Sequence, residues 1–457
     1  MLKSLQDING RKKIIILVIL LVVTFLSGGS SRIDAPMLII LRPLSLMICA
    51  WALFGIKIYH IKEYSYTNVL ALLSIFVSAV HLIPLSPEIW QSLSGRSLTT
   101  DIMISAGGQS DWLPLVVSPR YGWNAFYSIF TPLAVYLLAL QIGPRGQVTL
   151  LLSLIVLSFV SIVVAIVQST GFEIQLYPYN SAMSGLFANR NHQGILIACT
   201  IPMIYTATKL WRNSLRANIH KWKVFTLITS MMMAVIVVTG SRMAFLMSIL
   251  SILTLPLLSS NPSMSKLAKL TKNNKKTIAV LTIMLISTLL TFIVYGRDAT
   301  VYRFANVADD ARVSTWVQTL GIIPMYLPWG AGIGSYAHIY QIHEPLNLLT
   351  PTYSNHAHND WLETVLTLGL PGLTILLACV VLYLFSIRAA LSATGSSGDI
   401  RRLGMVILLV FGIASAVDYP LRTPILSSIF ALAVVWAATP PKPAKWRENE
   451  ESDVKNC

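Results

Sequence analysis

The chain has 457 residues, of which 54% are apolar and 12% are charged, and its mean hydropathy is +0.66. This composition excludes a soluble domain of that length, because apolar runs recur along the chain at the length needed to span a bilayer. The net charge of +15 does not indicate nucleic-acid binding, because the lysines and arginines lie in short segments that flank the apolar runs. We therefore expect an all-α polytopic membrane protein.

Apolar runs bounded by charged residues predict about twelve membrane-spanning helices. They lie near residues 14–28, 36–55, 68–85, 125–142, 148–168, 192–208, 224–240, 243–258, 277–295, 361–386, 403–417 and 424–438. The first run lacks a clear small-x-small cleavage site, so we interpret it as a span and not as a cleavable signal peptide. Pro371 should kink or break the tenth span. An even number of spans places both termini on one side of the membrane.

The distribution of lysine indicates which side that is. All 16 lysines fall in the two termini and in alternate loops, whereas the nine cations of the other loops are all arginine. Lysine-rich loops are retained in the cytoplasm, so both termini are predicted to be cytoplasmic. The outer arginines are Arg32, Arg96, Arg120, Arg190, Arg242, Arg297, Arg303, Arg312 and Arg422. They either reinforce the orientation and form ion pairs, or use the planar guanidinium group for bidentate capture of phosphate or diphosphate.

The domain organisation follows from this topology. We expect residues 1–438 to form the transmembrane domain, with outer loops at 86–124 and 296–360. The second loop lies between the ninth and tenth spans, and we expect it to hold a partly helical subdomain. Apolar residues after Arg312 recur at helical spacing, which suits an amphipathic helix on the membrane or over a cavity. Residues 439–457 are rich in proline and charge and are expected to form a disordered cytoplasmic tail.

The segment 355–363 (NHAHNDWLE) is a concentration of polar groups directly before an apolar run of spanning length. Asp360 is a favourable helix N-cap, and Glu363, three residues later, completes a capping-box pattern. His356 and His358 would then lie just outside the first helical turn, at the membrane surface, and both imidazoles point the same way if the stretch is extended. The helix N-terminus favours a neutral imidazole and the Asp360 charge opposes it, so the sequence leaves that balance open.

Three more polar clusters lie at the outer ends of predicted spans. The segment 189–193 (NRNHQ) enters the sixth span, where it either caps the helix with Arg190 extended toward the headgroups or faces a ligand. Arg242 lies in a tight turn with no acidic residue nearby in sequence, so its counter-charge comes from elsewhere in the fold or from a bound anion. The segment 418–422 (DYPLR) suits either an internal ion pair or a ligand contact.

Taken together, these motifs resemble a known family. His358-Asn359, followed after nine residues by Gly369-x-x-Gly372, is similar to the histidine motif of the O-antigen ligase and polymerase superfamily of bacterial inner-membrane glycan transferases. The segments 242–246 and 187–192 are similar to the family's arginine motif and to the loop that enters a middle span. The resemblance implies transfer of a saccharide from an undecaprenyl-diphosphate carrier to an acceptor hydroxyl at the periplasmic face, without metal, nucleotide or other cofactor.

The resemblance also implies roles for individual residues. His358 matches the family's essential histidine and Arg242 its motif arginine, and Arg312 is our candidate for a second essential arginine. His358 would be the base for the acceptor hydroxyl, while Arg242 and Arg312 clamp the diphosphate. The residues expected to bind or position carrier or acceptor are Arg190, Asn191, His192, His356, Asn359 and Asp360. Direct displacement of the diphosphate would invert the anomeric centre.

Several alternatives remain open at this stage. The acceptor is another lipid-linked repeat in a polymerase of O-antigen or exopolysaccharide, which we favour, or lipid A core in a ligase. A precursor transporter or flippase is disfavoured, because the span interiors hold almost no ionisable groups along a possible path. A metal-dependent hydrolase could use His356, His358, Asp360 and Glu363, but no further ligand is evident and the two carboxylates are assigned to capping.

Overall fold

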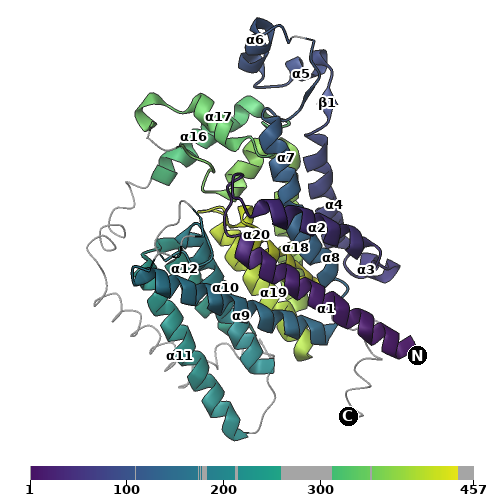
Figure 1. Cartoon of the computed structure of the whole chain (residues 1–457), viewed down its shortest axis with the longest axis vertical. Coiled ribbons are helices and arrows are strands. Elements are labelled where there is room, and N and C mark those ends of the chain that lie inside the picture. Colours follow the sequence, from purple (N-terminus) through teal and green to yellow (C-terminus); the bar gives the residue numbers. More distant parts are fainter. Residues whose placement is uncertain are drawn as a thin grey trace.

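The computed structural model describes residues 2–108, 110–172, 174, 176–177, 183–210, 215–258, 311–349 and 353–440. The predicted span 277–295, the first part of the loop 296–360 and the tail beyond residue 440 lie outside these residues. Most of the residues that the structure describes are helical. Figure 1 shows that α5 and α6 form one extremity of the molecule, beyond α16, α17 and α7.

The elements follow one another along the chain with short connections. The helices are α1 (Leu2–Ser27), α2 (Leu38–Leu53), α3 (Ile58–Glu63), α4 (Ser65–Val80), α5 (Pro87–Ser92), α6 (Ser97–Ser105), α7 (Pro119–Ser128), α8 (Phe130–Ala139), α9 (Pro144–Ser169), α10 (Arg190–Leu210), α11 (Leu215–Thr239), α12 (Arg242–Thr254), α16 (Ala311–Tyr326), α17 (Tyr336–His343), α18 (Asp360–Ser392), α19 (Gly395–Ala414) and α20 (Pro424–Ala438). Short 3-10 turns cover Leu255–Leu258, Leu346–Leu348 and Pro420–Arg422, the last labelled η3. Strands β1 (Pro84–Leu85) and β2 (Leu113–Pro114) pair antiparallel.

Every predicted span within the described residues overlaps a helix, with one difference in detail. The run predicted at 125–142 is divided between α7 and α8, which meet at Ile129. Pro132 explains the break, because it has no N–H to donate to the carbonyl of Ser128. By length and composition, α9, residues Trp222–Thr239 of α11, and α18 could each cross a membrane, and α2, α4, α20 and the stretch Arg242–Leu258 are shorter apolar helices. The described chain therefore fits an all-α membrane protein.

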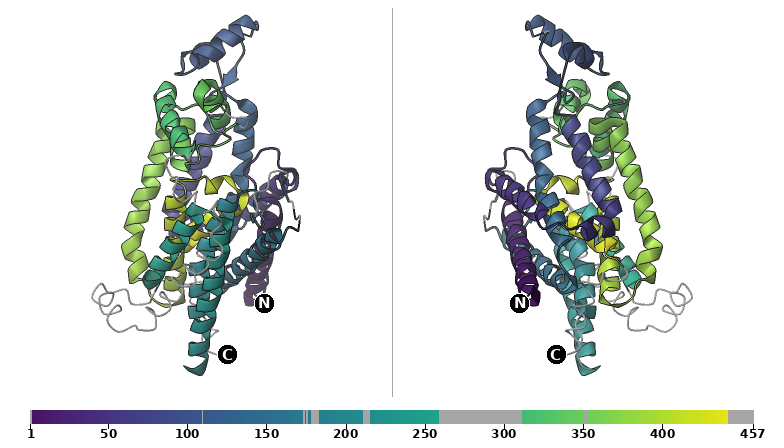
Figure 2. Two further views of the ribbon diagram at one scale, coloured as in Figure 1. Left: turned by 90° about the vertical axis from the view of Figure 1, so that its left-hand side faces the viewer. Right: turned by 90° about the vertical axis from the view of Figure 1, so that its right-hand side faces the viewer.

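The long helices run between two ends of the molecule. At one end, the Asp360 amide that begins α18 donates to the Ser415 carbonyl at the end of α19, at 2.8 Å. At the opposite end, Trp436 near the end of α20 donates through Nε1 to Gln147 Oε1 at the start of α9, also at 2.8 Å. We call the end where α18 begins and α19 ends the site end. Figure 2 shows α18, in light green, along one flank of the molecule.

The core lies where α8, α10, α19 and α20 pack together, and small residues allow the closest contacts. A Cβ added to Gly404 on α19 would lie 2.4 Å from the Ala437 nitrogen on α20. A Cβ on Gly194 of α10 would lie 2.0 Å from Cβ of Ala244 on α12. Small residues at such crossings let two helical backbones approach and gain dispersion contacts. The Gly194 contact brings the N-terminal turns of α10 and α12 together, and both turns belong to the site.

The expected kink in α18 is present, and it anchors the loop before α17. Gly369 has a positive φ of 62°, and an added Cβ there would meet the Pro328 carbonyl oxygen at 2.1 Å, so glycine is required. Pro371 cannot donate to the Thr367 carbonyl four residues earlier. That carbonyl instead accepts from the Gly332 amide at 2.9 Å. The kink therefore holds the loop before α17 against α18.

The helix expected after Arg312 is α16, and it covers the site end. Trp316 donates through Nε1 to the Ala357 carbonyl at 3.0 Å. Arg312 donates through Nη1 to the Val417 carbonyl, also at 3.0 Å. These two contacts tie α16 to the segment before α18 and to the turn after α19, so the helix lies over the polar residues of both.

Candidate active site

The start of α18 is capped by a residue other than the predicted one. Asn359, not Asp360, is the N-cap, and its Oδ1 accepts from the Leu362 amide at 3.0 Å. Asp360 is buried and its carboxylate accepts instead from Arg422 Nε at 3.0 Å. The capping-box prediction was wrong because a long-range ion pair takes the Asp360 carboxylate. Glu363 accepts from the Ala357 amide at 3.0 Å, so it stabilises the loop before the helix.

The two imidazoles of segment 355–363 have different carboxylate partners. His356 Nδ1 lies 3.0 Å from Glu363 Oε1, whereas His358 Nδ1 lies 3.7 Å from Asp418 Oδ1. The extended backbone that would place them alike is absent, because His358 has a positive φ of 50°. Such a conformation is strained for a residue with a Cβ and is often found at functional positions. Both rings still contact Tyr419, with centroids at 4.5 Å and 4.7 Å.

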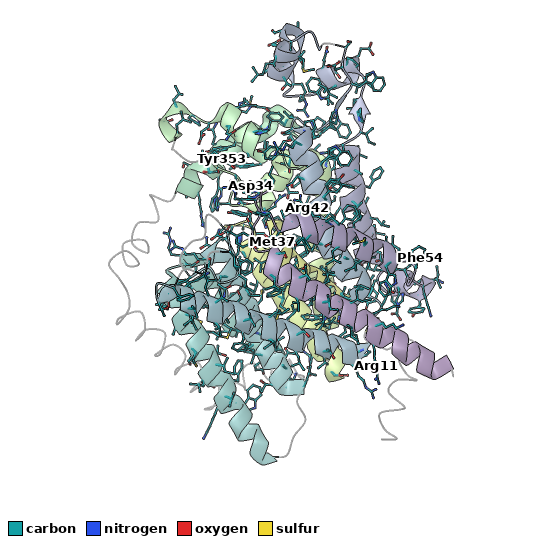
Figure 3. The ribbon with its side chains drawn as sticks, viewed as in Figure 1. Arg11, Asp34, Met37, Arg42, Phe54 and Tyr353 are labelled. Atoms are coloured by element: carbon teal, nitrogen blue, oxygen red, sulfur yellow. The ribbon has the colours of Figure 1, made fainter. Side chains whose placement is uncertain are left out.

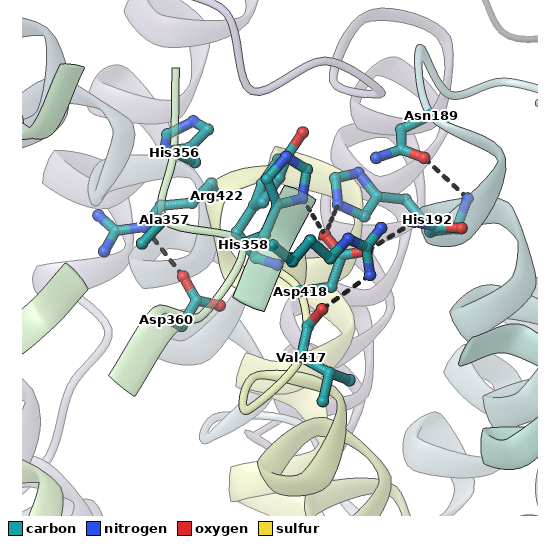
Figure 4. Close-up of polar contacts among 12 residues, drawn as sticks. Asn189, His192, His356, Ala357, His358, Asp360, Val417, Asp418 and Arg422 are labelled. Carbon is teal, nitrogen blue, oxygen red and sulfur yellow. Dashed lines mark hydrogen bonds and ion pairs between the residues drawn. The ribbon is translucent and has the colours of Figure 1, made fainter. Parts of the chain in front are cut away.

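Asp418 is the buried centre of one group of polar residues, shown in Figure 4. Its carboxylate accepts from Asn191 Nδ2 at 2.8 Å and from the Tyr419 amide at 2.9 Å. Three nitrogens that can carry positive charge each lie 3.7 Å from it, on His192, His358 and Arg312. We call Asp418, His358, Arg312, His192 and Asn191 the Asp418 cluster.

The electrostatics of this cluster keep Asp418 ionised. Burial alone would raise the pKa of the Asp418 carboxyl, but its interactions with His192 and His358 and the charge of Arg312 outweigh burial and hold that pKa well below its usual range. A carboxylate facing Nδ1 of His358 favours the tautomer with the proton on Nδ1, which leaves Nε2 free to accept a proton. The 3.7 Å separation is longer than a direct hydrogen bond, so the pair interacts through charge.

The turn that carries Arg242 is joined to the cluster through Asn191. Ser241 caps α12 by accepting from the Ala244 amide at 3.2 Å, and its hydroxyl donates to Asn191 Oδ1 at 2.7 Å. Asn191 therefore bridges Ser241 and Asp418. Arg190 and Arg242 are the first residues of α10 and α12 and lie beside this bridge in the chain. The segment 189–193 thus caps its own helix, one of the two alternatives left by the sequence, because Asn189 Oδ1 accepts from the Asn191 amide. It also contacts partners from distant segments.

A second group of charges lies at the same end. Arg422 contacts Asp360 Oδ1 at 3.0 Å and Glu363 Oε1 at 3.5 Å. The segment 418–422 therefore forms internal ion pairs, one of the two alternatives left by the sequence. Sequence reasoning noted Asp418 and Arg422 but did not include them, Tyr419 or Glu363 among the site residues. These residues could have been recognised in the sequence because an acidic and a basic residue, Asp418 and Arg422, flank a short turn between two apolar runs.

A large cavity, with a volume of about 1510 Å³, opens beside the second group. Of the predicted site residues, His356 and Asp360 line it, together with Glu363 and Arg422. The residues His358, Arg312, Arg242, Arg190, Asn191, His192 and Asn359 are not among those that line it. The structure thus places His356 and Asp360 at the cavity and His358, Arg312, Asn191 and His192 in the Asp418 cluster, whereas Arg242, Arg190 and Asn359 belong to neither group.

Metal binding was also considered from the sequence. Within the part of the chain that the structure describes, no three or more His, Cys, Asp and Glu side chains are grouped so that they could hold a metal ion. The polar groups that do converge are imidazoles, carboxylates and guanidinium groups. This set can move a proton and bind an anion.

Comparison with known proteins agrees with the resemblance seen in the sequence. A search of curated proteins finds no match. Residues 225–377 match the family model described as O-antigen ligase. The matched stretch contains Arg242, Arg312 and His358, and Asp418 lies beyond it. Residues 225–377 are therefore similar to the O-antigen ligase family, in agreement with the motifs.

Proposed function

We propose that this protein is a membrane glycosyltransferase that moves a saccharide from an undecaprenyl-diphosphate carrier to an acceptor hydroxyl at the periplasmic face of a bacterial inner membrane. The match of residues 225–377 to the O-antigen ligase family model supports glycan processing at a membrane in general. The observation that carries the proposal is that His358, in the segment before α18, and Arg312, on α16, both face the buried Asp418 carboxylate at 3.7 Å. A base and an anion-binding group are thereby held together.

The proposed base is Nε2 of His358. It takes the proton of the acceptor hydroxyl, whose oxygen attacks the anomeric carbon of the donor saccharide while the bond from that carbon to the diphosphate oxygen breaks. The electron pair of that bond leaves with the diphosphate. Asp418 orients the ring and stabilises the imidazolium that forms, as in other imidazole–carboxylate pairs. General base catalysis of this kind contributes typically about 10²–10⁴-fold. A single displacement inverts the anomeric configuration.

Arg312 and Arg242 are proposed to neutralise the departing diphosphate. Guanidinium groups bind such oxygens bidentately and remain charged at any relevant pH, so they stabilise the charge that grows on the leaving group without a metal. Arg312 is one quarter exposed, so it can reach a ligand while it also contacts Asp418. The Ser241–Asn191 hydrogen bond supports a location of Arg242 on the same side of the cluster.

The remaining predicted residues are assigned positioning roles by this proposal. Asn191 and His192 orient Asp418, and Asn359 fixes the start of α18 through its capping bond. Asp360, paired with Arg422, holds the turn after α19 against α18. Arg190 begins α10 and is proposed to contact the carrier. These roles replace the direct substrate contacts expected for the buried members.

His356 is a second candidate for the base, and a specific observation favours it. It lines the large cavity, and its Nδ1 lies 3.0 Å from the buried Glu363 carboxylate, a closer pair than His358 with Asp418. The two histidines are told apart by substitution. In the main proposal, His358→Ala abolishes transfer and His356→Ala weakens it less, and the reverse order would move the base to His356.

The acceptor and the topology also belong to the proposal. We propose about twelve spans with cytoplasmic termini, supported by the lysine distribution. Polymerisation of a cell-surface polysaccharide is the leading activity, and ligation to lipid A core is the second, favoured by the description of the matched family. The test is an assay of purified protein in detergent with lipid-linked donor and either acceptor. Transfer without a membrane gradient would exclude a transporter, and retained turnover in both histidine variants would refute the mechanism.

A further inference from the structure

The large cavity is a groove that follows α18 from its first turn to near its last turn. Tyr353 and His356 line it at the site end, and Ala389 and Arg401 line it at the opposite end. The lining residues of α18 extend from Asp360 to Ala389, which at about 1.5 Å per residue is roughly 40 Å. This length is close to the thickness of a bilayer with its headgroup regions.

Between its ends the groove is walled by apolar side chains from four helices. They include Leu70 on α4, Leu376 and Val380 on α18, Leu408 on α19, and Phe430 and Val434 on α20. Hydrocarbon is the chemistry that fits such a wall, because polar groups would lose hydration there without gaining hydrogen bonds. The shape and lining therefore suit a lipid chain that lies along the bilayer normal.

The charges at the site end of the groove indicate what headgroup such a lipid carries. Four arginines line this end, and two of them have their charge neutralised: Arg32 by Asp34 at 2.9 Å and Arg422 by Asp360 at 3.0 Å. For the other two, Arg42 and Arg120, no carboxylate of the described residues lies within ion-pair distance. These two guanidinium groups are available to an anion.

Arg42 and Arg120 are held around a common side chain. Arg42, on α2, donates through Nη2 to Asn124 Oδ1, and Arg120 lies one helical turn before Asn124 on α7. The Nε of Arg42 is buried and has no hydrogen-bond partner within the described part of the chain. An unsatisfied charged donor is costly to bury, and an anion that accepts from it removes that cost. Figure 3 shows Arg42 near Asp34 and Tyr353, which line the same end of the groove.

We propose that Arg42 and Arg120 bind the phosphate of a lipid-anchored acceptor whose hydrocarbon lies in the groove. This inference rests on the transferase function proposed above. It assigns donor and acceptor to separate headgroup sites, with the donor diphosphate at Arg242 and Arg312. Two lipid anions cannot share one small site, because their charges repel.

The position of segment 355–363 agrees with this division. His356 faces the groove, whereas His358 faces the Asp418 cluster, so the segment lies between the two sites. Arg42 and Arg120 both lie outside the stretch 225–377 that matches the family model. A phosphate on a lipid is common to a diphosphate-linked repeat and to a phosphorylated lipid A core. The inference excludes a water-soluble acceptor.

The kinetic test substitutes the two arginines singly and together, as Arg42→Gln and Arg120→Gln. Arg388→Gln is the matched control, because Arg388 is exposed on α18 and does not line the groove. The KM for donor and for acceptor is measured with a diphosphate-linked repeat and with phosphorylated lipid A core as alternative acceptors. Loss of a guanidinium–phosphate pair should raise the acceptor KM about tenfold or more. The donor KM and kcat should stay unchanged, and the acceptor that responds identifies the lipid.

A binding measurement keeps the inference separate from the transferase assignment. A fluorescent phosphatidic acid analogue and its phosphatidylcholine counterpart are titrated onto the purified protein. Wild type should prefer the phosphatidic acid probe, and Arg42→Gln with Arg120→Gln should remove that preference. A higher donor KM in the variants, an unchanged acceptor KM, or no preference in the wild type would each overturn the inference. Absence of any transfer by wild type, with the lipid preference intact, would instead refute the proposed function.

Discussion

Replacing Asp418 by asparagine tests the proposed mechanism at its centre. Asparagine keeps the size of the side chain and an oxygen that can accept from the Tyr419 amide, so the fold should survive. The change removes one negative charge that lies 3.7 Å from nitrogens of His358 and Arg312. The imidazolium that forms at His358 then lacks its counter-charge and is exposed to repulsion from Arg312.

The size of the effect can be worked from that distance. Two unit charges 3.7 Å apart attract by about 4 kcal/mol at an effective dielectric constant of about 20. His358 is 28% exposed, so solvent screens part of this energy. A loss of about 2–4 kcal/mol of transition-state stabilisation corresponds to roughly a 30- to 1000-fold lower kcat. Because the charge acts on the transition state, we expect kcat to fall more than the donor KM rises.

The assay is single-turnover transfer from a lipid-linked donor, measured for Asp418→Asn, His358→Ala and the double variant. If Asp418 acts through His358, adding Asp418→Asn to His358→Ala should cause no further loss. Asp399→Asn is the matched control, since Asp399 is also buried and pairs with Lys209 and Arg402, but at the opposite end of the molecule. Full activity of Asp418→Asn, or multiplicative losses in the double variant, would refute the reasoning.

Three further predictions concern stability and assembly of the site. Gly369→Ala should lower the thermal unfolding midpoint of the purified protein, because a Cβ at φ 62° costs about 1–2 kcal/mol and also meets the Pro328 oxygen. The control Gly412→Ala should leave the midpoint unchanged, because there is open space around Gly412. Ser241→Ala should lower the free energy of unfolding by about 1 kcal/mol, because α12 loses its N-cap. It should also raise the donor KM, because the hydrogen bond that joins Asn191 to the turn with Arg242 is lost. An unchanged donor KM would show that Arg242 acts independently of the Asp418 cluster. The stability that the ionised Asp418 provides is present above its unfolded pKa of about 3.9 and is lost only as the pH falls through its lower folded pKa. The difference in midpoint between wild type and Asp418→Asn should therefore not decrease between pH 7 and pH 5 and should decrease only in stronger acid. A decrease above pH 5 would contradict the assigned charge.

The positions of the helices could be predicted from the sequence because each depends on its own residues. Apolar runs of sufficient length predicted α9 and α20, and a periodic pattern after Arg312 predicted α16. Pro371 predicted the kink in α18, since the missing N–H is a local property. The location of polar groups at the ends of spans also followed, because a bilayer core does not tolerate them.

The pairing of those polar groups could not be predicted, because it depends on which helix ends meet. Asp360 is a good N-cap by local rules, yet Arg422, far along the chain, takes its carboxylate. The role of Asp418 could not be predicted for the same reason, because its partners Asn191 and Arg312 come from α10 and α16. These residues are far apart in the sequence, so nothing in their local pattern indicated that they would meet. The sequence showed only that charged residues are rare in this chain.

The shared use of Asp418 suggests how donor binding and base activation are connected in the proposed mechanism. The carboxylate faces Arg312 and His358 at equal distances of 3.7 Å. A diphosphate at Arg312 would supply that guanidinium with a stronger counter-charge. The negative charge of Asp418 would then act mainly on the imidazole of His358. The same event that binds the donor then stabilises the imidazolium required for attack. An acceptor hydroxyl arriving before the donor meets a carboxylate still shared with Arg312, so the cluster favours deprotonation only when both substrates are present.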